Sequence, residues 1–133
     1  MTALVFFYGT LMSGFRRPGR SSLDPVLVPV GRAWISAALF DLGIYPAAIP
    51  ASDTCVWGEV YQMLDPDAVL SSTDELEGVN PREPDTSLYT RTETLATFED
   101  GRVVTAWVYF YNAPLGRAER IESGDYLEHL KVK

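Results

Sequence analysis

Glu77 is a carboxylate at a position where the sequence pattern calls for an apolar side chain. It closes a helix predicted over residues 66–77, which starts after Asp65, an N-cap residue followed by proline, and stops before Gly78. At about 100° per residue, Glu77 falls on the same stripe as the residues that pack inward. Those residues are Val69, Leu70, Thr73 and Leu76. We therefore expect Glu77 to face the protein and Asp74 to point elsewhere.

A carboxylate held inside the last turn of a helix is suited to proton transfer. Burial disfavours the charged form, and the negative end of the helix dipole disfavours a second negative charge, so both raise the pKa of Glu77. A carboxylate with a pKa nearer to neutrality can accept a proton and return it. The alternative is that the side chain curls out from the helix end into solvent and is an ordinary surface acid.

A short motif of Tyr8, Gly9, Thr10 and Leu11 directly follows a predicted first strand. Glycine at a strand end lets backbone N–H groups approach a ligand closely, and the next residues can cradle an anion or a carbonyl group. An ordinary strand-ending turn uses the same residue types and is the commoner case. The motif is therefore a candidate binding loop that the residues alone do not separate from a turn.

Tyr109 is the remaining candidate for the site. It shares one face of a predicted strand with Val103, Thr105, Trp107 and Tyr111. We expect this face to point inward, where a tyrosine hydroxyl needs a partner. Either a ligand or Glu77 could supply that partner, although core packing against a water or a carbonyl group is the commoner situation.

The elements that position these residues are mostly strands. Alternation and β-branched content predict strands at about residues 3–8, 30–40, 55–63, 89–98 and 103–111, with helices at 66–77 and 125–132. Residues 12–29 should be largely irregular, and two prolines within 44–50 indicate a sheet edge. The pair 89–98 and 103–111 should form an antiparallel hairpin. We expect a single α+β domain over residues 1–133, with a small mixed, mostly antiparallel, curled or barrel-like sheet.

Composition limits the partners and the compartment. The chain has 133 residues, with 11 basic and 18 acidic side chains and a formal charge of -7, which argues against nucleic acid as a partner. No long apolar run and no signal peptide are present, so we expect no membrane partner and a cytoplasmic location. Arg16, Arg17 and Arg20 form the one basic cluster. We interpret it as a solvated loop, the alternative being a patch that attracts an anionic substrate.

Several common catalytic arrangements are excluded by the residue inventory. His129 is the only histidine and lies near the C-terminus, which argues against Ser-His and Cys-His catalysis. Cys55 is the only cysteine, so there is neither an intramolecular disulfide nor the ligand set of a zinc site. A glycine-rich phosphate loop is also absent. We expect no metal and no cofactor, so the chemistry should rest on carboxylates, tyrosines and backbone groups.

Short motifs along nearly the whole chain point to one family. In order they are residues 8–11, 41–43 with Tyr45 and Pro46, 58–61, 74–78, Tyr89 with Arg91, 106–109 and 123–125. This series resembles the γ-glutamylcyclotransferase family in its AIG2-like bacterial branch. The resemblance implies a small β-barrel flanked by short helices, with the site in a cavity at the barrel mouth.

The resemblance also implies a reaction and its residues. In this family the α-amine of a γ-glutamyl group attacks its own γ-carbonyl, which forms 5-oxoproline and expels an amine or an amino acid without a cofactor. Glu77 matches the essential glutamate and would act as general base and then general acid. The substrate-binding residues that the resemblance implies are Tyr8, Gly9, Thr10, Leu11 and Tyr109. The implied partner is a small-molecule γ-glutamyl substrate, and we expect a monomer or a weak homodimer.

The chain departs from the family pattern near the expected binding loop. Residues 12–15, Met-Ser-Gly-Phe, replace the basic residue and the asparagine that many small relatives carry, and residues 80–88 form a longer loop. Two other functions stay open at this point. One is a non-catalytic small-molecule binding module that keeps the barrel and the pocket. The other is an interaction domain with no cavity and with Glu77 in solvent.

Overall fold

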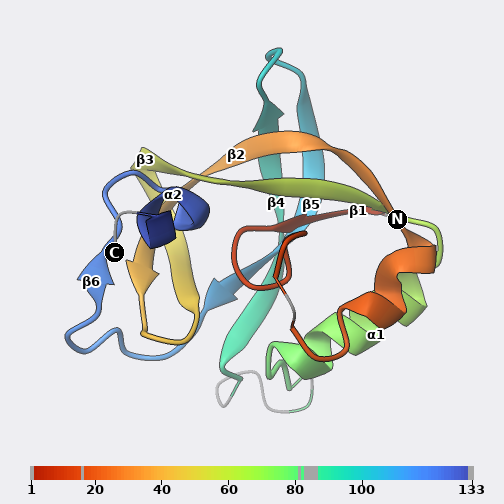
Figure 1. Cartoon of the computed structure of the whole chain (residues 1–133), viewed down its shortest axis with the longest axis horizontal. Coiled ribbons are helices and arrows are strands. Elements are labelled where there is room, and N and C mark those ends of the chain that lie inside the picture. Colours follow the sequence, from red (N-terminus) through yellow and green to blue (C-terminus); the bar gives the residue numbers. More distant parts are fainter. Residues whose placement is uncertain (1, 16, 81, 83–86, 132–133) are drawn as a thin grey trace.

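The computed structural model describes residues 2–15, 17–80, 82 and 87–131. In chain order the elements are β1 (Leu4–Phe7), the 3-10 helix η1 (Ser21–Val26), β2 (Leu27–Asp41), β3 (Pro46–Met63), α1 (Pro66–Leu76), β4 (Tyr89–Phe98), β5 (Val103–Tyr111), β6 (Glu119–Arg120) and α2 (Tyr126–Lys131). Figure 1 shows α1 close to the loop that follows β1, while α2 lies away from both, near the C-terminus.

Strands β1 to β5 form a closed mixed barrel. The order around it is β3-β1-β5-β4-β2, and β2 pairs back with β3. The β1–β5 pair is parallel, and the other pairings recorded among the described residues are antiparallel. This confirms the expected small, mostly antiparallel barrel with short helices. Strand β6 adds a short pairing to the outer part of β2.

The long β2–β3 hairpin corrects the predicted start of the third strand and confirms the sheet edge predicted at residues 44–50. We expected residues 44–50 and 55–63 to be separate, but β3 runs through both. Its prolines are tolerated because Pro46 and Pro50 pair with β2 in a region where no second strand partner is recorded among the described residues; β1 joins β3 only at residues 59–62. Register shifts at Pro29/Gly31 and Ser36/Ala37 bend the hairpin, as bulges do.

The remaining elements lie close to their predicted places. Strands β4 and β5 have the predicted bounds and form the expected antiparallel hairpin. Helix α1 ends one residue earlier than predicted, and β2 begins three residues earlier. The loop predicted to be irregular contains η1. Helix α2 lies inside the predicted range 125–132, the end of which is outside the described residues.

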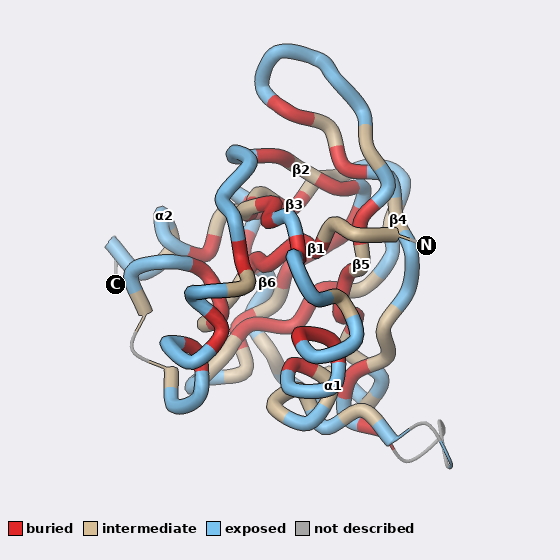
Figure 2. The backbone as a smooth tube through the Cα atoms, turned by 90° about the vertical axis from the view of Figure 1, so that its right-hand side faces the viewer, coloured by how far each residue is buried: buried red, intermediate tan, exposed pale blue. Residues whose placement is uncertain are grey.

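The core fills the barrel. Its largest fully buried side chains come from β1, β2, β3, β5 and one face of α1, and they are Phe6, Ile35, Leu39, Val5, Val56, Val60, Val69, Val108 and Thr73. Figure 2 shows the buried backbone at the centre and an exposed hairpin tip above it.

Among the described residues, no helix is long and apolar enough to cross a membrane.

Candidate functional site

A pocket at the end of β1 collects all six residues that the sequence analysis selected. Its lining comprises Phe6, Phe7, Tyr8, Gly9, Thr10, Leu11, Arg17, Tyr45, Pro46, Glu77, Tyr89 and Tyr109. The space inside is about 20 Å³, roughly enough for one water molecule. The residues are therefore gathered as expected, in a pocket that is narrow in this conformation.

The end of α1 fixes the position of Glu77. Its backbone N–H donates to the Thr73 carbonyl (2.9 Å), and the next two residues close a Schellman motif: Gly78 N bonds Glu75 O (3.2 Å) and Val79 N bonds Asp74 O (2.8 Å). Gly78 has a φ of 66°, the left-handed conformation that this motif needs. Glu77 is thus the C-cap residue, and its side chain turns into the pocket.

The Glu77 carboxyl group is shielded from water. Its side chain is 14% exposed, and burial raises its pKa from 4.5 to about 7, against the opposing charge of Arg17. The expected inward direction and raised pKa are therefore confirmed. At neutral pH such a group is divided between its acid and base forms, so it can transfer protons in either direction.

Arg17 corrects our interpretation of the basic cluster as a solvated loop. Its Nη1 lies 3.5 Å from Glu77 Oε1 and donates to Thr10 Oγ1 (2.9 Å), and its Nη2 donates to the Leu76 carbonyl (2.6 Å). Arg20 is buried and donates to the Leu11 carbonyl (2.8 Å). Both side chains turn inward because loop and helix-end carbonyls need donors. Arg16 lies outside the described residues.

Tyr109 has different partners from those we expected. Its hydroxyl donates to Asp74 Oδ1 (2.6 Å) and lies 2.6 Å from the Thr73 hydroxyl, so it is not bonded to Glu77. Asp74 also accepts two hydrogen bonds from Arg91 (2.8 and 3.1 Å), so our expectation that Asp74 points away was wrong. These contacts tie the last turn of α1 to β4 and β5, which holds Glu77 in place.

The face of β5 that carries Tyr109 was also assigned wrongly. The face buried along the strand is that of Ala106, Val108 and Phe110, whereas Thr105 is exposed and Trp107 only half-buried. Tyr109 is buried on the opposite face because α1 covers it there, through the contacts to Thr73 and Asp74. Alternation along the strand gave two candidate faces, and the packing of the helix determined which residues were buried.

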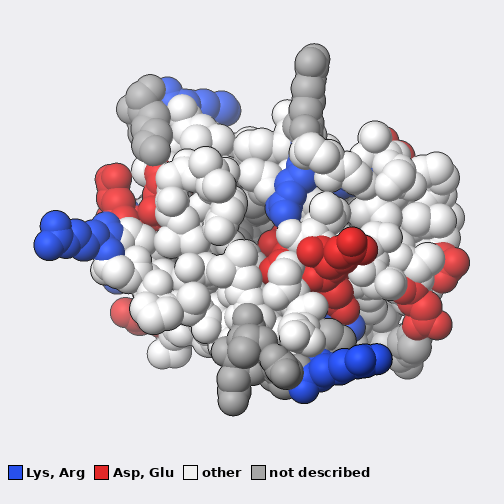
Figure 3. Space-filling view, turned by 90° about the horizontal axis from the view of Figure 1, so that it is seen from below, with Lys and Arg blue, Asp and Glu red and all other residues white. Residues whose placement is uncertain are grey.

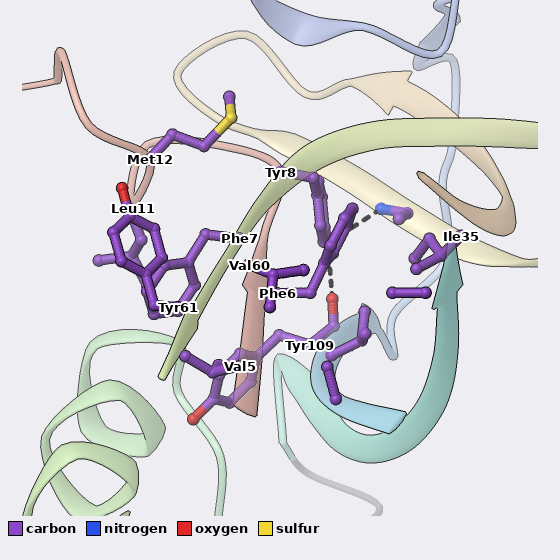
Figure 4. Packing of buried hydrophobic residues seen from close by; sticks show 14 of the residues in the cluster. Val5, Phe6, Phe7, Tyr8, Leu11, Met12, Ile35, Val60, Tyr61 and Tyr109 are labelled. Carbon is purple, nitrogen blue, oxygen red and sulfur yellow. Dashed lines mark hydrogen bonds between the residues drawn. The ribbon is translucent and has the colours of Figure 1, made fainter. Parts of the chain in front are cut away.

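Tyr8 and Tyr89 are two of the three other tyrosines that line the pocket. Tyr8 donates to the Tyr109 carbonyl (2.6 Å; Figure 4) and accepts from Ala48 N (3.2 Å). Tyr89 donates to the Pro46 carbonyl (2.8 Å). Burial, with the Glu77 charge as a lesser cause, raises the pKa of both hydroxyls. Both therefore stay neutral with their protons committed to backbone groups, and Glu77 is the carboxylate among the lining residues.

The loop after β1 supplies backbone donors. Among the described residues, no hydrogen bond engages the backbone N–H groups of Thr10 and Leu11, both of which line the pocket. A Cβ at Gly9 would lie 2.8 Å from Pro46 Cγ, so glycine is needed for this close approach. The loop is therefore compatible with the cradle proposed from its sequence.

Six lining residues were absent from the predicted site: Phe6, Phe7, Arg17, Tyr45, Pro46 and Tyr89. Three of them, Tyr45, Pro46 and Tyr89, stand in the motifs of the family resemblance, which was the available signal. Arg17 had no such signal, because side-chain direction in a loop rich in glycine and proline follows no period.

Figure 3 shows the face on which α1 lies, with acidic side chains near its centre and a basic side chain beside them.

The shielded carboxylate leads to a prediction about stability. Because the pKa of Glu77 is about 7 in the folded state and 4.5 ordinarily, the folded state binds the proton more tightly, and stability falls as pH rises between these values. Glu77→Gln should thus raise the free energy of unfolding by about 1–3 kcal/mol at about pH 8 and change it little at about pH 4. Denaturant unfolding at both pH values measures this, with the exposed Glu75→Gln as control. An equal difference at both pH values would contradict the shift.

Comparisons with known proteins agree with the fold. The family model described as "Gamma-glutamyl cyclotransferase, AIG2-like" matches residues 5–128. The gamma-glutamylcyclotransferase family protein YtfP of Escherichia coli K12 is 34% identical over 93 residues, 70% of each chain. Its solution structure has a TM-score of 0.65 at 31% identity and covers 95% of this chain and 97% of YtfP.

Two crystal structures extend the likeness in fold. An AIG2-like protein from Mus musculus has a TM-score of 0.67 at 24% identity, covering 92% of this chain and 88% of that one. YkqA from Bacillus subtilis has a TM-score of 0.74 at 22% identity; 99% of this chain is covered, but this chain spans only 42% of YkqA. With the family model matching almost from end to end, the chain belongs to the AIG2-like gamma-glutamyl cyclotransferase family.

Proposed function

We propose that this protein is a cofactor-free γ-glutamyl cyclotransferase, which releases 5-oxoproline and an amine or amino acid from a γ-glutamyl compound. The observation that carries the proposal is Glu77, a shielded carboxylate with a pKa of about 7 that lines the pocket. Family membership supports this class of reaction. The N–H groups of Thr10 and Leu11, which no hydrogen bond among the described residues engages, provide the second element that the chemistry needs.

The reaction is an intramolecular acyl transfer. Glu77 takes a proton from the substrate α-ammonium, and the freed amine nitrogen attacks the γ-carbonyl carbon, forming the new C–N bond of a five-membered ring. The bond between the γ-carbon and the leaving nitrogen then breaks as Glu77 returns its proton to that nitrogen. The ring nitrogen passes its second proton to the departing amine, which leaves as an ammonium ion, and Glu77 is again a carboxylate. The nucleophile and the electrophile belong to one molecule, so positioning supplies much of the rate.

The other lining residues have supporting roles in this scheme. The N–H groups of Thr10 and Leu11 stabilise the negative charge that develops on the γ-carbonyl oxygen. Tyr8 and Tyr89 shape the pocket and keep water away from Glu77. Tyr109 acts as a positioning residue, because its bonds to Thr73 and Asp74 hold the helix turn that carries Glu77.

A panel of γ-glutamyl amides and γ-glutamyl amino acids tests the proposal. Each compound is incubated with the protein, and both 5-oxoproline and the free amine are quantified by mass spectrometry. We expect both products in equal amounts from at least one compound class. Tight binding of these compounds without any product would contradict the proposal and favour the non-catalytic binding module.

The pKa of Glu77 also predicts a pH profile. The base form of Glu77 must be present in the free enzyme, so kcat/KM should fall about tenfold per pH unit below about pH 7. Arg17 lowers the pKa of Glu77, and Arg17→Ala should therefore move this limb to higher pH. Steady-state kinetics between about pH 5 and pH 8 measure the acid limb of kcat/KM in wild type and in Arg17→Ala. A profile that is flat across this range, or a limb that Arg17→Ala leaves in place, would contradict the role given to Glu77.

A further inference from the structure

Arg17 and Glu77 present opposite charges side by side in the pocket. Arg17 Nη1 lies 3.5 Å from Glu77 Oε1, and both side chains line the same cavity. Among the described residues that line the pocket, Arg17 carries the one positive side chain. The pair is therefore the complement of a zwitterion, in which an ammonium group and a carboxylate are attached to the same carbon.

Charge balance favours an anion as the ligand of Arg17. The protein has a formal charge of -7, and Glu77 is the other charged side chain among the lining residues that the structure describes. A substrate carboxylate entering beside Glu77 would meet a like charge in a shielded site, which costs free energy unless a cation is present. Arg17 is the group that can supply it, and a guanidinium matches the geometry of a carboxylate.

The contacts of Arg17 allow an exchange of partners. Its Nη2 is anchored to the Leu76 carbonyl at the C-terminal end of α1, where a positive charge is favoured. Its Nη1 contacts Thr10 and Glu77, the two groups beside the space that a ligand would occupy. The free space of about 20 Å³ holds roughly one water molecule, so a glutamyl group requires lining side chains to move, and the contacts of Arg17 Nη1 are among those that can open.

We propose that Arg17 binds the α-carboxylate of the γ-glutamyl group while Glu77 takes its α-ammonium, so that the pair selects a free α-amino acid head group. This inference rests on the proposed function for its substrate. Arg17 is then a specificity-determining residue contributed by a loop in which this chain departs from the family pattern. The alternative is that Arg17 only caps α1, and the two roles differ in which substrates they affect.

Two substrates that differ by one carboxylate test the inference. The first is γ-glutamyl butylamide; the second is 4-aminobutyryl butylamide, which keeps the amine and the reacting carbonyl and would cyclise to 2-pyrrolidinone. Wild type should favour the first in kcat/KM by about 10–100-fold, as expected for a hydrogen-bonded charged pair. Arg17→Ala should lower kcat/KM for the first by a similar factor and change the second by less than about threefold, with Arg17→Lys intermediate.

The matched control is Arg102→Ala. Arg102 is exposed and pairs with Asp100 in the turn between β4 and β5, so its loss should change neither substrate. An equal loss for both substrates in Arg17→Ala would assign Arg17 to helix capping and overturn the inference. An increase for both would show that Arg17 only obstructs the pocket, and this also overturns it.

A binding measurement separates failure of this inference from failure of the proposed reaction. 5-Oxoproline and 2-pyrrolidinone share a ring and differ by the carboxylate, and calorimetry measures their affinities without turnover. Wild type should bind 5-oxoproline at least tenfold more tightly, and Arg17→Ala should lose that preference. Absence of turnover with this binding pattern would contradict the cyclotransferase but support Arg17 as the carboxylate site. Equal affinities, no binding of 5-oxoproline, or a preference that survives in Arg17→Ala would overturn the inference.

Discussion

Glu77→Gln is expected to lower kcat for γ-glutamyl cyclisation by about 10²–10⁴-fold, the range typical of a lost general acid-base group. The amide keeps the size of the side chain and its place at the end of α1, but it cannot accept a proton from the substrate ammonium. KM should change much less, because the binding loop at residues 9–11 is untouched. Initial rates at saturating substrate measure the effect.

The control for this variant comes from the same helix. Glu75 is exposed two residues away, so Glu75→Gln removes one negative charge without entering the pocket and should keep wild-type kcat. We expect Glu77→Gln to be more stable than wild type above about pH 7, and a denaturant unfolding curve that shows this would exclude unfolding as the cause of a loss of activity. A Glu77→Gln protein with wild-type kcat would remove Glu77 from the chemistry.

The second large effect is expected for Gly58→Ala. Gly58 lies on β3 next to Glu59, where the recorded pairing of β3 with β1 ends. A Cβ at Gly58 would collide with the Phe7 carbonyl oxygen and lie 2.7 Å from Phe6 Cζ. The backbone cannot yield without separating β1 from β3, so we expect a loss of about 3 kcal/mol in the free energy of unfolding. This close approach also sets where the chain enters the loop at Gly9 and Thr10.

Gly31→Ala is the matched control for this change. Gly31 lies on β2, and a Cβ there would make an ordinary contact of 3.4 Å with Phe98 Cδ1. Neither glycine has a positive φ, so backbone strain does not separate the two variants. Urea unfolding should show Gly31→Ala within about 1 kcal/mol of wild type. Equal losses in the two variants would contradict the steric account.

The parts of the fold that followed from the sequence are those with local signals. The β4–β5 hairpin was predicted to the residue because β-branched strands flank a turn, and α1 because Asp65 and Gly78 mark its ends. The closure of the barrel through β2 and β3 depends on long-range pairing. The continuity of β3 through Pro50 was missed because the pattern of prolines cannot show on which side a strand lacks a partner.

The candidate site shows the same division. Glu77 was predicted from the helical period, since its direction depends on neighbours three and four residues away. The partners of Tyr109 were missed because they depend on how α1 packs across the outside of β5, which no local pattern encodes. Arg17 was missed for a related reason: its direction is set by the carbonyl of Leu76, 59 residues away in the sequence.

The most direct test of the central claim is the fate of the γ-carbonyl in water labelled with oxygen-18. Intramolecular attack by the α-amine forms 5-oxoproline without using water, whereas hydrolysis forms glutamate that carries the label. We predict unlabelled 5-oxoproline and free amine in equal amounts from wild type, and the same products at least about 10²-fold more slowly from Glu77→Gln. Labelled glutamate from wild type, or unlabelled 5-oxoproline formed equally fast by Glu77→Gln, would contradict a cyclisation driven by this carboxylate.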